Sequence, residues 1–157
     1  MSTVTWAIGP LDLEIVAALH GASFREAWGV REIAELMAMP GAFGLIAAVP
    51  SAGAPEPAGF LIARTAAGSC EILSIGVTPA YRRGGLARLL MEHATGLAVA
   101  GGADRIFLEV AEDNWGARRL YAALGFAPVG RRRNYYRHGQ SSVAALTMQR
   151  MLDTGLA

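Results

Sequence analysis

Residues 72–90 read ILSIGVTPAYRRGGLARLL and place a strand, a loop and a helix in immediate succession. Two arginines and two glycines at positions 82–85 stand directly before the leucine-rich helix. The first backbone N–H groups of a helix lack intrahelical partners and lie at the positive end of the helix dipole. Such an end binds phosphate, and glycines let a ligand approach the backbone closely. The stretch therefore predicts an anion-binding loop at the start of this helix.

The charge distribution agrees with an anion site in the second half of the chain. Residues 1–78 hold seven acidic and three basic side chains (net −4), whereas residues 79–157 hold six acidic and eleven basic ones (net +5). All fourteen basic residues are Arg, which we interpret as genome bias. The asymmetry suggests that the basic half handles an anion, and scattered surface charge is the competing explanation.

Length and composition limit the class of protein. A chain of 157 residues, 53% of them hydrophobic, fits one domain over residues 1–157 with a substantial core. Prolines interrupt the most apolar stretch, residues 41–63, so we expect no membrane span, and the first residues lack the features of a secretory signal. The single cysteine, Cys70, excludes an internal disulfide and a multi-thiolate zinc site, and we expect it to be buried. A cytoplasmic protein is expected.

Several other classes of site are excluded. The Walker motif needs a lysine, which the chain lacks, and the dinucleotide fingerprint G-x-G-x-x-G is absent. No nucleophile elbow or Ser–His–Asp order is present, so a hydrolase is not expected. The histidines are scattered, and we interpret His93 as a core residue on the inward face of its helix.

Hydrophobic periodicity and turn residues predict elements in the order β-α-α-β-β-β-α-β-α-β-β. The expected strands are 3–8, 43–49, 59–65, 70–77, 105–110, 126–132 and 143–151, and the expected helices are 12–21, 30–39, 86–100 and 115–124. Antiparallel hairpins come first, and one strand–helix–strand crossover lies in the middle. This order predicts a mixed α/β (α+β) fold, not a doubly wound parallel sheet.

The loop and its flanks resemble one known family. The loop reads Arg82-Arg83-Gly84-Gly85-Leu86-Ala87 after Ile75-Gly76-Val77. This is similar to the Arg/Gln-x-x-Gly-x-Gly/Ala motif of the GNAT superfamily of acetyl-CoA-dependent N-acyltransferases. Further matches follow in that family's order at Leu108-Glu109-Val110, Asn114, Leu120-Tyr121 and Leu124-Gly125-Phe126. The resemblance implies the GNAT fold, with a mixed, mostly antiparallel sheet of six to seven strands flanked by about four helices.

Within that family, the chain is most similar to the RimI-type branch, the ribosomal-protein N-terminal alanine acetyltransferases. The residues that carry this similarity are 71–77, 109–110 and above all Arg132-Arg133-Asn134-Tyr135-Tyr136, with a weaker match at 24–28. It implies direct transfer of an acetyl group from acetyl-CoA to the N-terminal α-amine of a protein, with the N-terminal Ala of a small-subunit ribosomal protein as the expected acceptor. Two residues depart from the pattern: Ala87 replaces the commoner Gly, and Ser74 replaces a larger polar residue.

The resemblance also assigns residues to the coenzyme. Amides of the loop would hold the pyrophosphate, and the strand before the loop would splay from the Glu109 strand to admit the acetyl arm. A backbone N–H near Val77 would stabilise the oxyanion. Asn114 would contact the pantetheine arm, although helix capping alone explains an Asn there. The expected coenzyme-binding residues are Ile75, Gly76, Val77, Arg82, Arg83, Gly84, Gly85, Leu86, Ala87, Arg88 and Asn114, and no metal is expected.

Two residues are candidates for the acyl-transfer chemistry. Glu109 is the only charge within residues 106–110, and a carboxylate there can take the amine proton directly or through a water. An α-amino group, with a pKa of about 8, needs little assistance from a base. Tyr121 matches the family position from which a phenol protonates the leaving thiolate. The competing explanations are a solvent-facing Glu109 and a core aromatic at position 121.

Other functions remain open at this point. The same fold could acetylate a small amine, a polyamine or an internal Lys. A binding module could use residues 131–137, in which arginines and tyrosines combine charge with stacking, to bind RNA. We favour a loop that shapes the acceptor site over an RNA contact for this run.

Overall fold

The computed structural model describes residues 2–138 and 141–153 and contains a seven-stranded sheet in the order β1-β2-β3-β4-β5-β7-β6. The strands are β1 (Val4–Ala7), β2 (Ala42–Val49), β3 (Glu56–Ala66), β4 (Ser69–Val77), β5 (Arg105–Ala111), β6 (Ala127–His138) and β7 (Ser141–Met151), and the α-helices are α1 (Leu13–Ser23), α2 (Val30–Met37), α3 (Leu86–Ala100) and α4 (Trp115–Ala123). Neighbouring strands are antiparallel except β4 and β5, which are parallel. The expected mixed sheet and element order are confirmed. No helix in the described part of the chain is long and apolar enough to cross a membrane.

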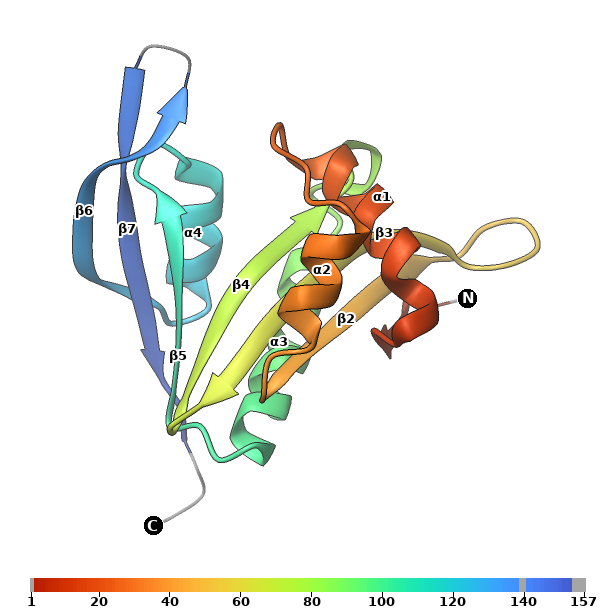
Figure 1. Ribbon diagram of the computed structural model, residues 1–157, viewed down its shortest axis with the longest axis horizontal. Helices are drawn as coiled ribbons and strands as arrows, with labels where there is room; N and C mark the ends of the chain where they lie inside the picture. The colour runs from red at the N-terminus through yellow and green to blue at the C-terminus, as the bar shows by residue number, and fades with distance from the viewer. Residues whose placement is uncertain (1, 139–140, 154–157) are drawn as a thin grey trace.

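The helices cover the sheet in two layers (Figure 1). Helices α1 and α2 pack on one face, and α3 and α4 pack on the other. Strand β3 contacts both layers of helices, because successive side chains of a strand point to opposite faces of the sheet. Phe60 and Ile62 pack with α1 and α2, whereas Leu61 and Ala63 pack with α3, and all four are fully buried. Burial on both faces explains the continuous apolar run of this strand.

Strands β4 and β5 pair only at their beginnings. Their parallel register stops at the pair Ile72 and Leu108. The next residue of β4, Leu73, has no partner on β3, because the register of β3 and β4 shifts there. A bulge of this kind bends a strand and increases its local twist. The carboxyl ends of β4 and β5 therefore diverge (Figure 1), which opens the gap that the family resemblance implies.

Helix α3 buries a narrower face than the sequence suggests. Its buried residues are Leu86, Leu90, Met91, Ala94 and Ala98. His93 lies beside this stripe and is exposed, and its Nδ1 is 3.0 Å from the Thr5 hydroxyl. The interpretation of His93 as a core residue is therefore wrong. Exposed apolar residues such as Leu97 made the apolar face of the helix look wider than its contact with the sheet.

The arginine- and tyrosine-rich run from position 131 lies in strand β6, not in a loop as expected. Arg132 pairs with Ala145 and Tyr136 pairs with Val143, so three residues of β6 face one residue of β7. Within this bulge Asn134 has a φ of 54°, a left-handed conformation that Asn tolerates better than most residues. The expected strand 126–132 therefore ends too early, because such a bulge interrupts the alternation of side chains beyond residue 132.

Candidate active site

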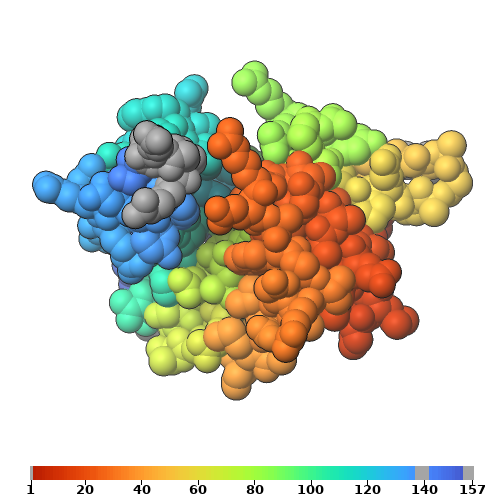
Figure 2. Space-filling view, turned by 45° about the horizontal axis from the view of Figure 1, so that its top comes forward, coloured from red at the N-terminus to blue at the C-terminus, as the bar shows by residue number. Residues whose placement is uncertain are grey.

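The gap between β4 and β5 holds two adjoining cavities, and a space-filling view shows the hollow between the N-terminal helices and the C-terminal strands (Figure 2). We name the first, of about 540 Å³, the carboxylate cavity, because its lining includes Glu26, Glu71 and Glu109. We name the second, of about 740 Å³, the arginine cavity, because its lining includes Arg82, Arg83 and Arg88. The residues that line both cavities, and so mark where they join, are Phe24, Ile75, Asn114, Ala117 and Tyr121.

The two cavities carry opposite charge. Among the described residues, no arginine lines the carboxylate cavity and no carboxylate lines the arginine cavity. Low-dielectric walls lined by charges of one sign concentrate the electric field and attract ligands of the opposite sign. The arginine cavity is thus suited to an anion, and the carboxylate cavity is suited to a cation.

The backbone of the arginine cavity is arranged for an anion. Helix α3 begins after Gly85, and no side chain caps this end. Both Arg83 (φ 66°) and Gly85 (φ 85°) are left-handed, and this conformation is strained for an arginine. Gly84, between them, does not have a positive φ. A backbone that alternates in this way forms a concave nest of N–H groups, which binds anions. Leu86, the first residue of α3, lines the cavity and is buried.

The structure brings the predicted coenzyme residues together with one exception. All of them line the arginine cavity except Gly84, which sits in the loop but does not contribute to the lining. The side chain of Arg82 turns back, and its Nε donates to the Val77 carbonyl at 2.9 Å. Tyr81 donates its hydroxyl to Glu56 at 2.6 Å, so the start of the loop is held to β3.

The end of β4 directs a backbone N–H toward the gap. The Thr78 N–H donates to the Ala58 carbonyl on β3 at 2.9 Å. Because successive peptide groups of a strand point to opposite edges, the N–H of Val77 points away from β3 and into the gap. This is where the resemblance places an oxyanion donor.

Gly76 is held between two elements, and we predict that it tolerates no side chain. A Cβ on Gly76 would lie 2.9 Å from Phe60 Cε1 and 2.9 Å from Ser23 Cβ. Gly76→Ala should therefore lower the free energy of unfolding by about 1–3 kcal/mol through overpacking. In contrast, Gly96→Ala on α3, where a Cβ meets nothing within 4 Å, should raise it by up to about 1 kcal/mol through helix propensity. Urea unfolding measures both, and equal stabilities of the two variants would contradict the packing described here.

Glu109 lies in the wall of the carboxylate cavity, and its side chain is 27% exposed. Arg132 Nη2 lies 3.6 Å from Glu109 Oε1, beyond hydrogen-bond distance. Glu71 lines the same cavity from β4, two residues before the splay. Burial, and then repulsion by Glu109, raise the pKa of the Glu71 carboxyl, and Arg64 partly offsets this rise. Glu109 therefore faces the cavity, not bulk solvent as the competing explanation held.

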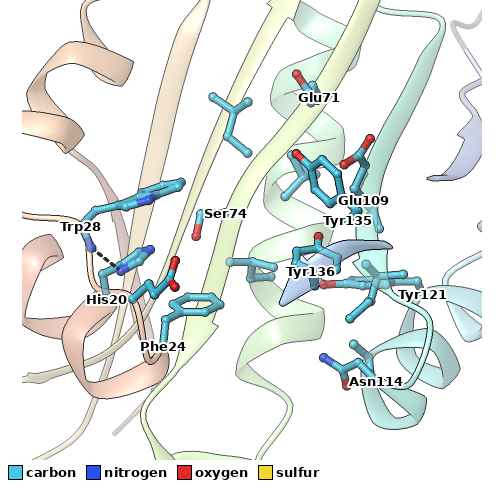
Figure 3. A pocket seen from close by; sticks show the side chains of 18 residues that line it. His20, Phe24, Trp28, Glu71, Ser74, Glu109, Asn114, Tyr121, Tyr135 and Tyr136 are labelled. Carbon is cyan, nitrogen blue, oxygen red and sulfur yellow. Dashed lines mark hydrogen bonds between the residues drawn. The ribbon is translucent and has the colours of Figure 1, made fainter. Parts of the chain in front are cut away.

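Tyr121 lies on α4 where the cavities join (Figure 3). It is 7% exposed and its ring packs against Phe126, with the centroids 5.9 Å apart. Its hydroxyl makes no hydrogen bond within the described part of the chain. Burial, with a smaller contribution from Tyr136, raises the pKa of Tyr121 to about 12. The phenol is therefore protonated throughout the neutral range, and it is a donor rather than a base.

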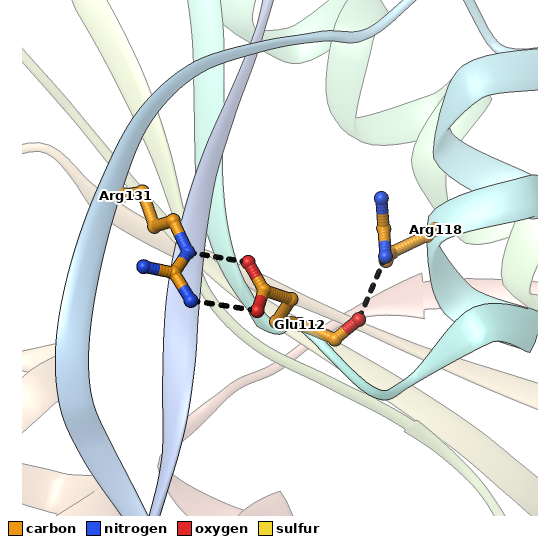
Figure 4. A network of polar contacts seen from close by, with 3 residues as sticks. All are labelled: Glu112, Arg118 and Arg131. Carbon is orange, nitrogen blue, oxygen red and sulfur yellow. Dashed lines mark hydrogen bonds and ion pairs between the residues drawn. The ribbon is translucent and has the colours of Figure 1, made fainter.

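Asn114 caps α4, as its position in the sequence suggests. Its Oδ1 accepts the N–H of Ala117 at 3.2 Å, and the residue also lines both cavities. The turn before it is held by Glu112 (Figure 4). Arg131 Nε and Nη2 donate to the Glu112 carboxylate at 2.6 and 2.9 Å, and Arg118 Nη1 donates to its main-chain carbonyl at 2.7 Å. This network ties β6 and α4 to the end of β5.

Two arginines of the 131–137 run are engaged within the molecule. Arg131 pairs with Glu112, and Arg132 lies against the Tyr135 ring, 4.6 Å from its centroid, and near Glu109. Tyr135 and Tyr136 both line the carboxylate cavity. The run thus contributes to the site through both tyrosines, and Arg131 and Arg132 contact residues of the same molecule.

Several lining residues escape prediction from the sequence. His20, Phe24 and Trp28 line the carboxylate cavity from the first helical layer, opposite Glu109 and the tyrosines (Figure 3). The weak family match at 24–28 was a signal for two of them, and the buried His20 had none. Glu71 lies within residues 71–77, which resemble the RimI-type branch, but that resemblance assigns no role to it.

The comparisons with known proteins agree with this geometry. A model of the acetyltransferase (GNAT) family matches residues 13–126. An N-alpha-acetyltransferase RimI from Mycobacterium tuberculosis is 42% identical over 94 residues, which are 60% of this chain and 55% of that protein. A [Ribosomal protein bS18]-alanine N-acetyltransferase from Salmonella typhimurium is 35% identical over 91 residues, 58% of this chain and 62% of that protein. The chain therefore belongs to the GNAT acetyltransferase family.

The structural comparison supports the fold. The crystal structure of the ribosomal-protein-S18-alanine N-acetyltransferase from Escherichia coli superposes with a TM-score of 0.86 and 24% sequence identity, over 96% of this chain and 94% of that one. The expected GNAT fold is thus confirmed. The matched segments span less than two thirds of the length of the two curated relatives named above.

Proposed function

We propose that this protein transfers an acetyl group from acetyl-CoA to the N-terminal α-amine of a protein in the cytoplasm, with the N-terminal Ala of a small-subunit ribosomal protein as acceptor. The observation that carries this proposal is the pair of oppositely charged cavities that meet at Tyr121. An anionic coenzyme in one cavity and a cationic amine in the other would bring their reacting ends together at this junction. The names of the curated relatives support the choice of acceptor.

The arginine cavity fits coenzyme A. Its uncapped helix end and the left-handed Arg83 and Gly85 supply amides for the pyrophosphate. Arg83 and Arg88 add charge, with guanidinium forks that suit phosphate oxygens. The edge of β4 that diverges from β5 would align the pantetheine arm toward the junction, and Asn114 would contact that arm from the start of α4.

At the junction, the chemical groups would lie on opposite sides of the thioester. Glu109 takes one proton from the acceptor α-ammonium group, directly or through a water, and the freed lone pair forms the new C–N bond. The nitrogen then loses its second proton to water, which leaves a neutral amide. The backbone N–H of Val77 faces the gap and would stabilise the oxyanion. As the C–S bond breaks, Tyr121 donates its proton to the departing sulfur. A phenol that stays protonated at neutral pH is suited to this task.

The charge of the carboxylate cavity supports an acceptor that carries positive charge. Glu26, Glu71 and Glu109 would attract the α-ammonium group and basic residues near it. The aromatic walls would enclose a small first side chain.

Release of the coenzyme A thiol tests the proposal, with a panel of synthetic peptides that differ only in their first residue. We expect turnover with N-terminal Ala, and mass spectrometry should place the acetyl group on the α-amine. Matched peptides with a blocked α-amine and a free internal Lys should not react. Acetylation of Lys or of small polyamines alone would contradict the choice of acceptor.

A further inference from the structure

His20 is buried at the wall of the carboxylate cavity, where it has no assigned role. It is 3% exposed, and it is the one polar residue among the buried side chains of the described chain. Its ring stacks on Trp28 (centroids 4.5 Å apart, planes 18° apart) and packs against Phe24 at 4.5 Å. The ring of Phe60 on β3 also packs against His20, with the ring centroids 5.6 Å apart.

His20 holds both ends of the segment that connects α1 and α2. Its main-chain carbonyl accepts the N–H of Phe24 at 2.9 Å, and its Nδ1 accepts the N–H of Trp28 at 3.0 Å (Figure 3). Residues 25–27 lie between these points and make no hydrogen bond or ion pair with any described residue. The side chain of one histidine is thus the polar anchor for the far end of the segment.

The anchored segment forms one wall of the active site. Phe24 lines both cavities, and Glu26 and Trp28 line the carboxylate cavity. We propose that His20 is a positioning residue, whose Nδ1 fixes the segment 24–28 as the wall against which the acceptor binds. The link to the acceptor rests on the proposed function, whereas the anchoring of the segment does not.

The anchor works only when the imidazole is neutral. Because Nδ1 accepts a hydrogen bond, the neutral ring carries its proton on Nε2, and a second proton would occupy Nδ1 and break the bond. Burial lowers the pKa of His20. The released segment, with a solvated histidine, protonates near the ordinary pKa of about 6.5. The anchored state therefore loses stability as the pH falls below about 6.5, and the loss is complete below the lowered pKa.

Other titratable groups face the same cavity and must be separated from His20. They are Glu26 in the segment, Glu71 on β4, Glu109 on β5, Tyr121 on α4, and Tyr135 and Tyr136 on β6. Substitutions at position 20 leave all of them in place. A comparison of variants at each pH therefore isolates the contribution of His20.

Two substitutions separate the hydrogen bond from the ring. His20→Phe keeps an aromatic ring in the stack and removes the acceptor, whereas His20→Asn keeps an acceptor at the δ position and removes the ring. Hydrogen exchange of the Trp28 amide, followed by NMR on the coenzyme-free protein, reports the anchor without any acetyl transfer. At neutral pH, exchange should be about tenfold faster in His20→Phe and close to wild type in His20→Asn. Trp28 exchange in His20→Phe as slow as in the wild type would overturn the anchoring.

Kinetics test the consequence for the acceptor. With an N-terminal Ala peptide, His20→Phe should raise the KM for the peptide about fivefold, with kcat and the Kd for coenzyme A within about twofold of wild type. The wild-type KM should rise below about pH 6.5 relative to that of His20→Asn, whose acceptor oxygen does not titrate. An unchanged peptide KM together with fast Trp28 exchange would overturn the positioning role alone. Absence of acetyl transfer by the wild type would instead refute the proposed function, and the exchange result would still decide the anchor.

Discussion

Glu109→Gln is expected to lower kcat about 100-fold at neutral pH, because removal of a general base costs at least two orders of magnitude in typical enzymes. The carboxylate lies in the cavity wall at the point where β5 leaves β4, with Arg132 3.6 Å away. Glutamine keeps the shape of the side chain and cannot take a proton. The Kd for coenzyme A, measured by titration calorimetry, should stay within about twofold, since Glu109 does not line the arginine cavity.

The pH dependence of the Glu109→Gln variant is a sharper signature than its rate at one pH. An α-amino group loses its proton near pH 8 without assistance, so the deficit of the variant should narrow as the pH rises above about 8. Glu71→Gln is the matched control, because it removes the same charge from the same cavity, two residues before β4 leaves β5. It should change the peptide KM and leave kcat within about threefold. Equal losses of kcat in both variants would mean that cavity charge, not proton transfer, explains the effect.

Tyr121→Phe is expected to lower kcat about 100-fold and to leave the KM values nearly unchanged, because in the proposed mechanism the phenol acts only when the C–S bond breaks. Its pKa of about 12 keeps the proton available over the whole assay range. Its hydroxyl bonds to no described residue, so the substitution should leave the free energy of unfolding unchanged. Steady-state kinetics and urea unfolding together separate a chemical role from a packing role.

Tyr136→Phe supplies the control for a phenol in the same cavity. Tyr136 lines the carboxylate cavity only, and burial, followed by Glu109, raises its pKa. Loss of the Tyr136 hydroxyl should change the KM for the peptide and leave kcat within about threefold of the wild-type value. If Tyr121→Phe kept full turnover with acetyl-CoA, the assignment of the leaving-group acid would be wrong.

The parts of the site that the sequence predicts are local ones. The loop before α3 is marked by its own glycines and by the start of an amphipathic helix, and Asn114 is marked by the helix that it caps. Each of these patterns spans only a few neighbouring residues, so it can be recognised without knowledge of the tertiary structure.

The parts that the sequence leaves open depend on contacts between distant elements. The wall formed by His20 and Trp28 requires α1 to pack over Phe60 of β3, and the turn of Arg82 toward Val77 requires the final loop geometry. The bulge in β6 breaks the alternation from which strands are recognised, so the expected strand ends at residue 132 and not at His138. The mistaken burial of His93 has the same origin, because periodicity shows an apolar face but not how much of it the sheet covers.

A crystal structure of this protein with acetyl-CoA tests the central claim most directly. We predict the pyrophosphate on the backbone amides that follow Arg83 at the start of α3, and the thioester carbon at the junction of the cavities, between Glu109 and Tyr121. A coenzyme bound elsewhere, or a thioester directed away from Glu109, would contradict the account.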